Sequence, residues 1–419
     1  MIIDQTQLGG SDPRLILWCL VQASSAAYAK LTSAFGSAEA ALSEPISAWS
    51  GAGLHSSHIK RLSEPKSSLK QLEQTLLQLR DQRFWVSYHG DPDYPALLCE
   101  VADAPAVLFG RGRQALLADP HLAVVGTRSP TPSARATTEQ FVQMLSRSGL
   151  SIVSGLAAGI DAVAHTAALK AAPQTSGAQT VAVMGCGVDL CYPPSNQKLL
   201  EDVLDQGGTV ISEYLPGTRA LKHHFPRRNR IISGMSMGTL VIEAAQRSGS
   251  LITASMAAEF GRSVFAVPGF IGNQKAVGCH DLIRGGATLC YQPEQVLEEL
   301  SAQIKLLIAD QRTNAARAGS YAEHQAGKAA SNQLHKRAQA NPLVESKPEH
   351  GTCERPRTQQ GSADTPLLAA LSNHALSLDE LVSQLSWPIP EIIEQLTLLE
   401  ISGQITQQAG RYQRSGWTQ

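Results

Sequence analysis

Six short, almost wholly apolar runs occupy the middle of the chain and limit the folds it can adopt. They are HLAVVG, LSIVSG, TVAVMG, TVISEY, TLVIEAA and SVFAVPG, between residues 121 and 269. Segments of helical length, such as 134–149 and 195–208, separate these strand-like runs. Continuous rather than alternating apolar strands are typical of a parallel sheet with helices on both faces. The sequence therefore predicts an α/β domain at residues 115–300, with a doubly wound, mostly parallel, Rossmann-like sheet.

The segments that flank this domain differ from it in composition. Residues 1–80, with Ala, Leu and Ser at helical spacing, predict a small helical domain, and the Pro- and Asp-rich residues 81–114 predict a connecting segment. Residues 301–362 lose all periodicity and predict a disordered linker. Residues 363–419 predict three short helices and a two-stranded wing that turns at Gly410, which together indicate a winged-helix module.

Composition excludes several classes of protein. The net charge of −1 over 419 residues excludes a histone-like polycation, so a nucleic-acid partner must be met by a local patch. The seven cysteines are scattered and never spaced as CxxC, which is typical of free thiols in a reducing cytoplasm. The N-terminus has neither a basic leader nor an apolar run long enough to span a membrane. We expect a soluble, cytoplasmic protein with no metal and no cofactor.

The ends of the predicted strands are unusually small and polar. In a parallel sheet these ends share one edge, where ligands bind. Glycine lets a backbone amide approach an anion, and the following helix adds its N-terminal dipole. Tight strand-to-helix turns alone would also explain the glycines, but an arginine stands in the first turn. We predict a phosphate site formed by Gly126, Thr127, Arg128, Ser154, Gly155, Gly159, Gly185 and Gly187.

The most concentrated positive charge lies just after the fourth apolar run. Residues 219–230 hold five cations and no carboxylate, and they leave the same edge of the predicted sheet. Arginines can fork onto phosphate oxygens, and aromatic rings there can stack on bases. A solvated charge run is the alternative. We predict contact with nucleic acid through Lys198, Lys222, His224, Phe225, Arg227, Arg228 and Arg230, with Tyr192 as a further ring face for bases.

Catalytic motifs are incomplete. No GxxxxGK[ST] loop exists, and GCGVDL has Leu190 where a dinucleotide fingerprint needs its third glycine. The GxSxG match at 234–238 precedes a strand rather than following one, so Ser236 is not expected to be a nucleophile.

Four further polar residues could have either a catalytic or a structural role. Asp161 and His165 are four apart on one helix face, where they could act as acid and base or could cap the helix and pack inside it. We predict the structural role for this pair. Glu213 and Glu243 end strands, and we expect them to hold nearby arginines.

The C-terminal module is acidic. Residues 363–419 contain six acidic and two basic residues, and the predicted recognition helix carries Glu391, Glu394 and Glu400. Duplex DNA repels such a face, so we expect a protein-contact or regulatory module. A regulator that binds double-stranded DNA through this helix is the competing hypothesis.

Five long motifs resemble the DNA-processing protein A family (DprA, also called Smf). They are VVGTRSPTPSAR, SGLAAGIDAVAH, CGVDLCYPPSNQKL, ISEYLPGTRALKHHFPRRNRIISGMS and EAAQRSGSLITASMAAEFGRSVFAVPG, in order over about 120–292. The resemblance implies an extended Rossmann-like domain that binds single-stranded DNA without sequence preference. It also implies an N-terminal helical domain of the SAM or helix-hairpin-helix kind. It further implies a homodimer that loads the RecA recombinase during natural transformation.

The family's phosphate pocket would lie on the first six of the strand-edge residues named above, with the arginines at 227, 228 and 230 lining or bracing a positive surface. The chain departs from the family pattern at Ala158 and Pro194, where relatives often carry a basic residue.

A nucleotide-processing enzyme is the alternative function. Phosphoribohydrolases of the same broad Rossmann-like group carry PGGxGTxxE, and the corresponding stretch here is SGMSMGTLVIE. The proline and the double glycine are missing, and Glu243 comes too late after Thr239. The sequence therefore favours a binding protein over an enzyme.

Overall fold

The computed structural model describes residues 11–55, 58–60, 66–171 and 179–307 of the first part of the chain. Near the C-terminus it describes residues 371, 376–377, 380–381, 396, 405–408 and 411–414. The chain divides into two compact units, 1–333 and 334–419, and each is described by itself.

One nine-stranded sheet forms the centre of the first unit, in the order β1-β2-β6-β5-β4-β3-β7-β8-β9. From β6 to β9 all neighbours are parallel, and β1 and β2 join one edge in antiparallel pairing. The six apolar runs form β3 to β8, so the predicted doubly wound sheet is confirmed. The strands are β1 (Trp85–Tyr88), β2 (Val107–Gly112), β3 (His121–Val125), β4 (Ser151–Ser154), β5 (Thr180–Val183), β6 (Thr209–Ser212), β7 (Gly238–Val241), β8 (Ser263–Ala266) and β9 (Thr288–Leu289).

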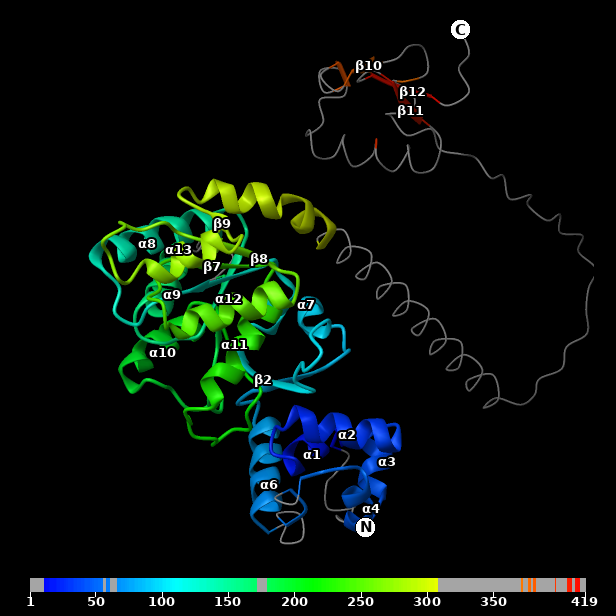
Figure 1. The fold of residues 1–419 in the computed structure, drawn as a ribbon. Helices are drawn as coiled ribbons and strands as arrows, with labels where there is room; N and C mark the ends of the chain where they lie inside the picture. Colours follow the sequence, from blue (N-terminus) through cyan, green and yellow to red (C-terminus); the bar gives the residue numbers. More distant parts are fainter. Residues whose placement is uncertain are drawn as a thin grey trace, which may run out of the picture. The chain divides into compact units, whose positions relative to one another are not determined.

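Helices cover both faces of the sheet (Figure 1). Along β3, Leu122 and Val124 pack with the core beneath α8 and α9, whereas Ala123 and Val125 pack with the core beneath α11 and α12. Both faces are buried, which explains why the strands lack polar alternation. The helices are α8 (Pro132–Arg147), α9 (Ile160–Ala171), α10 (Gln197–Asp205), α11 (His224–Gly234), α12 (Gly249–Glu259) and α13 (Val277–Arg284).

The N-terminal residues form the predicted small group of helices, drawn in blue in Figure 1. Trp18 and Trp49 are fully buried among them. The same apolar core continues into the sheet through Phe109 of β2 and Tyr214 after β6, so these helices are packed firmly against the sheet. The helices are α1 (Pro13–Leu20), α2 (Ser25–Phe35), α3 (Ala38–Ser43), α4 (Ile46–Gly51) and α6 (Lys66–Arg80).

Two predicted boundaries of the sheet domain were wrong. Residues 81–114 do not only connect domains, because they contribute β1, β2 and the short α7 (Ala96–Cys99), and β2 pairs with β6. The turn residues between these strands obscured them in the sequence. At the other end, a helix over residues 294–307 crosses the predicted boundary at 300 and buries Val296 and Leu300. The rest of the predicted linker lies outside the described residues.

The second unit contains a three-stranded sheet in the order β10-β12-β11. β11 (Ile405–Gln408) and β12 (Arg411–Arg414) are antiparallel, which confirms the predicted wing, and β10 (Leu376–Ser377) pairs with β12. Most residues of the three predicted helices lie outside the described residues. Across the part of the chain that the structure describes, no helix has both the length and the apolar character needed to cross a membrane.

Candidate nucleic-acid interface

A pocket of about 610 Å³ opens at the carboxyl edge of the parallel strands. It lies where the strand order reverses, because α8 leads from β3 to β4 on one side while β7 flanks β3 on the other. This switch point is the usual ligand site of doubly wound sheets. We call this pocket the edge pocket. Its walls come from the turn after β3, the start of α9, the start of α11 and the start of α12.

The turn after β3 supplies the first wall through Gly126, Thr127 and Arg128. A side chain at Gly126 would meet Ile160 at 2.6 Å, so only glycine lets this turn approach α9 so closely. The amide of Thr127 donates to the Glu243 carbonyl at 2.7 Å, which ties the turn to β7. Arg128 is exposed and has no ion-pair partner within the described residues, so its charge is available to an anion.

The segment before α11 supplies the second wall. Lys222 is exposed and, like Phe225, lines the edge pocket. The Phe225 ring packs on Gly185, where an added Cβ would meet it at 3.2 Å. Tyr192 lies beside Phe225, with ring centroids 5.2 Å apart and planes at 43°. This aromatic pair offers ring faces next to a cation, which is the combination that binds single-stranded nucleic acid.

The start of α12 supplies a third wall that the sequence analysis missed. Ser248 caps this helix and accepts from the amide of Ser250, and both residues line the pocket with Thr253. Arg247 beside them is exposed. A helix N-terminus attracts anions through its amides and dipole. The signal in the sequence was the small polar run Ser-Gly-Ser after the β7 strand.

A buried arginine and a buried aspartate lie at the floor of the pocket. Arg228 is 5% exposed, and its Nη1 donates to the carbonyls of Gly155, at 2.6 Å, and of Val183. Asp161 accepts from the amides of Gly155 and Ala157. Burial lowers the pKa of Arg228 and raises the pKa of Asp161, and the attraction between the two opposes both shifts. Arg228 therefore holds two strand-end turns together from inside the protein.

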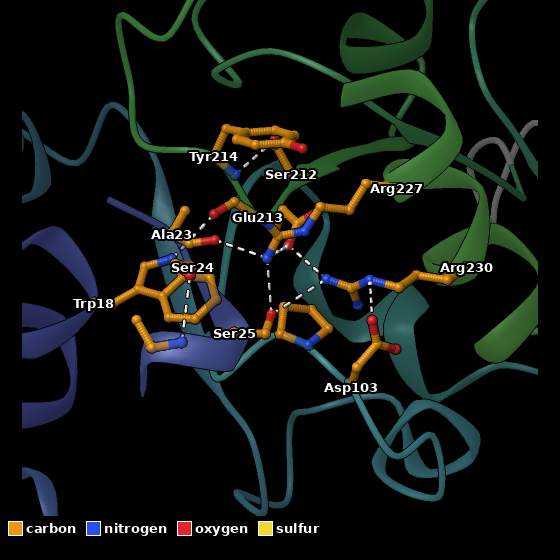
Figure 2. Close-up of polar contacts among 12 residues, drawn as sticks. Trp18, Ala23, Ser24, Ser25, Asp103, Ser212, Glu213, Tyr214, Arg227 and Arg230 are labelled. Atoms are coloured by element: carbon orange, nitrogen blue, oxygen red, sulfur yellow. Dashed lines mark hydrogen bonds and ion pairs between the residues drawn. The ribbon is translucent and has the colours of Figure 1, made fainter. Parts of the chain in front are cut away.

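Two other arginines of the cation run turn away from the pocket. Arg230 is 3% exposed and lies 2.5 Å from the fully buried carboxylate of Glu213. Its Nε also faces Asp103 at 3.2 Å. Arg227 meets the same Glu213 carboxylate at 3.2 Å, as Figure 2 shows. Burial raises the pKa of Glu213, and the two arginines counter this rise.

The same contacts join α11 to the N-terminal helices. The Nη2 of Arg227 donates to the Ala23 carbonyl at 2.9 Å and to the Ser25 hydroxyl at 3.0 Å. The indole of Trp18 donates to the Glu213 carbonyl at 3.0 Å (Figure 2). Buried hydrogen bonds of this kind fix one element against another. Arg227 and Arg230 thus brace the region, and direct phosphate contact by Arg230 is not compatible with its burial.

Several further residues singled out in the sequence lie behind or beside the pocket. Gly159 has φ +87° and approaches the backbone of Thr127 and Arg128, which forces glycine there. Glu243 is buried and binds the amide and hydroxyl of Thr131, both at 2.9 Å. Lys198 is 85% exposed on α10 and pairs with an aspartate one turn later, away from the pocket walls. Three more residues predicted from the sequence also do not line the edge pocket, namely Ser154, Gly187 and His224.

The catalytic alternatives have buried side chains that are already hydrogen-bonded. The Ser236 hydroxyl donates to the Ile232 carbonyl at 2.8 Å inside the fold. His165 is completely buried, and its Nδ1 pairs with the Thr180 hydroxyl at 2.8 Å. Neither side chain reaches the edge pocket.

Comparison with known proteins identifies relatives across most of the chain. The family model of DNA recombination-mediator protein A matches residues 85–301, and that of the DprA winged helix domain matches residues 353–411. The chain is 38% identical over 333 residues to the protein Smf of Synechocystis sp., which covers 77% of this chain and 78% of the relative.

A further relative by sequence and a similar solved structure both come from Streptococcus pneumoniae. The DNA processing protein DprA of this organism is 47% identical over 209 residues, or 50% of this chain and 72% of the relative. The X-ray structure of its DNA processing protein A aligns with a TM-score of 0.58 and 36% identity, over 68% of this chain and 97% of that one. Together with the family models, these matches confirm the resemblance found in the sequence and the winged-helix module.

Proposed function

Because this chain belongs to the DNA recombination-mediator protein A family, we propose that it binds single-stranded DNA without sequence preference in the edge pocket. The observation that carries the proposal is the meeting of Arg128 and Lys222 with an aromatic pair at one open pocket. The cations would neutralise phosphates, and the ring faces would stack on bases of any kind.

The arrangement favours a single strand over a duplex. In a duplex the bases are stacked inside the helix and cannot reach the rings of Tyr192 and Phe225. In a single strand they turn outward and can stack, which adds roughly 1–3 kcal/mol per base. The charges and the rings then act together only on a single strand.

Binding rather than catalysis accounts for the carboxylates in and behind the edge pocket. Asp161 is engaged with backbone amides, and Glu243 is saturated by Thr131 and Asn273. A phosphoribohydrolase would need a carboxylate facing its substrate. We therefore propose that the protein is not an enzyme. Release of free base from a nucleoside monophosphate at high protein concentration would contradict this.

We further propose that the bound strand is passed to the RecA recombinase in the cytoplasm during DNA uptake, as the family resemblance implies. The expected result is a shorter lag in RecA's DNA-dependent ATP hydrolysis on oligo-dT when the protein is added. An unchanged lag in the presence of saturating protein would separate single-strand binding from RecA loading.

A homodimer is the last part of the proposed function. Phe270 and Ile271, in the loop after β8, are 82% and 89% exposed, and large neighbouring apolar side chains so exposed favour association. Two copies would present two sites to one strand and raise the effective affinity. Light scattering of wild type and of F270S/I271S tests this, with the variant expected to be monomeric. A monomeric wild type would contradict the dimer.

The experiment that tests single-strand binding is fluorescence anisotropy of labelled oligo-dT and of a duplex of equal length over a salt series. We expect oligo-dT to bind more tightly, with log affinity falling by about 0.7 per phosphate neutralised for each tenfold rise in salt. Arg128→Ala should weaken binding and reduce this slope by about 0.7.

Arg147→Ala is the matched control, because Arg147 is exposed in the last turn of α8, at the opposite edge of the sheet. It should bind as wild type does. Equal affinity for duplex and single strand, or an Arg128→Ala protein indistinguishable from the control, would contradict the proposal.

A further inference from the structure

A second pocket of about 480 Å³ lies between the N-terminal helices and the start of α11. We call it the seam pocket. Its walls come from the end of α1, from α6, from the segment after β6, and from α11. The residues that matter for its chemistry are Gln22, Gln71, Tyr214, His223, His224 and Arg227.

The walls of this pocket are held by buried contacts rather than by loose packing. Arg227 binds Ala23 and Ser25 on one side and Glu213 on the other, so it ties α11 to the N-terminal helices (Figure 2). The Tyr214 ring stacks on the His224 ring, with centroids 4.0 Å apart and planes at 20°. These contacts connect the walls of the pocket to one another.

The chemistry of the lining fits a nucleobase. The described residues that line the pocket include no carboxylate, so nothing there repels the phosphate that accompanies a base. The exposed His223 offers a ring face and ring nitrogens, and two glutamine side chains can exchange donors and acceptors with any base edge. The charge of Arg227 is already shared with Glu213, which leaves too little free positive charge for an acidic peptide.

The seam pocket adjoins the edge pocket across a single turn of chain. Lys222 and Phe225 line the edge pocket, whereas His223 and His224 line the seam pocket. Lys222 and His223 lie in the turn before α11, and His224 and Phe225 are its first two residues, so this short segment forms a ridge with one pocket on each side. A strand that leaves the edge pocket over this ridge meets the His223 ring next, because that side chain is exposed.

We propose that the seam pocket is a second base-binding subsite, which takes a nucleotide of the same single strand next to those in the edge pocket. This inference rests on the proposed single-strand binding. It adds the N-terminal helices to the DNA-binding surface and makes His223 a determinant of the length of strand that the protein recognises.

The test is oligo-dT affinity measured as a function of length, from a trinucleotide to the length at which affinity stops rising. His223→Ala should bind the shortest oligonucleotides as wild type does and should lose about fivefold in affinity at the longest, the lower end of what one stacked base contributes. Arg147→Ala is the control, because it removes an exposed cation outside both pockets and should follow wild type at every length.

Thermal unfolding of each variant verifies its fold. If His223→Ala follows wild type at every length, or weakens all lengths equally, the seam pocket is not a subsite for the strand. If wild type fails to bind oligo-dT of any length, the proposed function fails, and this inference fails with it.

Discussion

Glu213 follows directly on β6, and its side chain has no exposed surface. A carboxylate in that position costs free energy unless cations accompany it. Arg227 and Arg230 provide that charge, and in doing so they are withdrawn from the surface. The glutamate therefore holds two cations of the 219–230 run away from a strand, whereas Arg219 and Lys222 are exposed.

Glu213→Gln tests this arrangement. Removing one partner of a buried charge group leaves an uncompensated guanidinium, which costs roughly 3–5 kcal/mol. We expect a loss of that size in the free energy of unfolding, measured by urea denaturation.

Asp103→Asn is the matched control, because Asp103 faces the same Arg230 but is 64% exposed. Such an exposed pair contributes about 1 kcal/mol or less. Equal losses for the two variants would contradict the view that Glu213 is the residue that holds the arginines.

His165 lies one helical turn after Asp161 and is completely buried. Its Nδ1 pairs with the Thr180 hydroxyl, while its Nε2 has no partner within the described residues. A proton on Nε2 would be buried, with the charge of Arg228 nearby. Burial and Arg228 accordingly lower the pKa of His165 from 6.5 to about 3.

This shift gives a prediction for stability against pH. The unfolded chain takes up the proton near pH 6.5 and the folded protein only near pH 3, so acid favours unfolding throughout that interval. Between pH 7 and pH 5 His165 alone should remove about 2 kcal/mol from the free energy of unfolding. Asparagine can keep the donor to Thr180, so His165→Asn should flatten this part of the profile. An unchanged slope in the variant would contradict the assignment.

At the scale of elements, α11 explains why the sequence analysis assigned too many residues to the DNA. The charge run was treated as one patch, because composition alone does not say which way each side chain points. Once the residues form a helix, its 3.6-residue period separates them, and Ile231 and Ile232 face the sheet. Arg228 and Arg230 are therefore buried. Their burial depends on partners in other segments, which the local sequence does not identify.

The aromatic pair at the edge pocket also depends on two elements, since Tyr192 comes from the loop after β5 and Phe225 from α11. Phe225→Ala should lower oligo-dT affinity by roughly 1–3 kcal/mol, because a stacking face is lost. Duplex binding should hardly change. Phe225→Tyr keeps the ring and should restore affinity, and a tyrosine variant as weak as the alanine variant would argue against stacking. Anisotropy with both substrates measures each quantity.

At the scale of the whole molecule, the apolar runs were enough to predict the parallel sheet and the edge at which its turns meet. They could not predict β1 and β2, because short edge strands among turn residues carry no clear period. They also gave no sign of the α12 wall, since Ser248 and Ser250 reach the pocket only through the crossover that sets β7 beside β3. Strand order comes from long-range packing, and a local pattern does not encode it.

The winged-helix unit gives a prediction at the same scale. Residues 363–419 carry six acidic and two basic residues, so their removal takes away charge that repels phosphates. Deleting them should leave oligo-dT affinity unchanged or slightly higher at low salt, as measured by anisotropy. A large loss of affinity would show that the DNA site includes this unit.

The central claim is that the strand lies in the edge pocket, and amide hydrogen exchange with and without oligo-dT tests it most directly. We predict slower exchange in peptides that cover 125–131, 219–230 and 245–253, with no comparable effect of an equal concentration of duplex. Protection confined to residues 363–419, or absent from all three segments under saturating oligo-dT, would contradict the account.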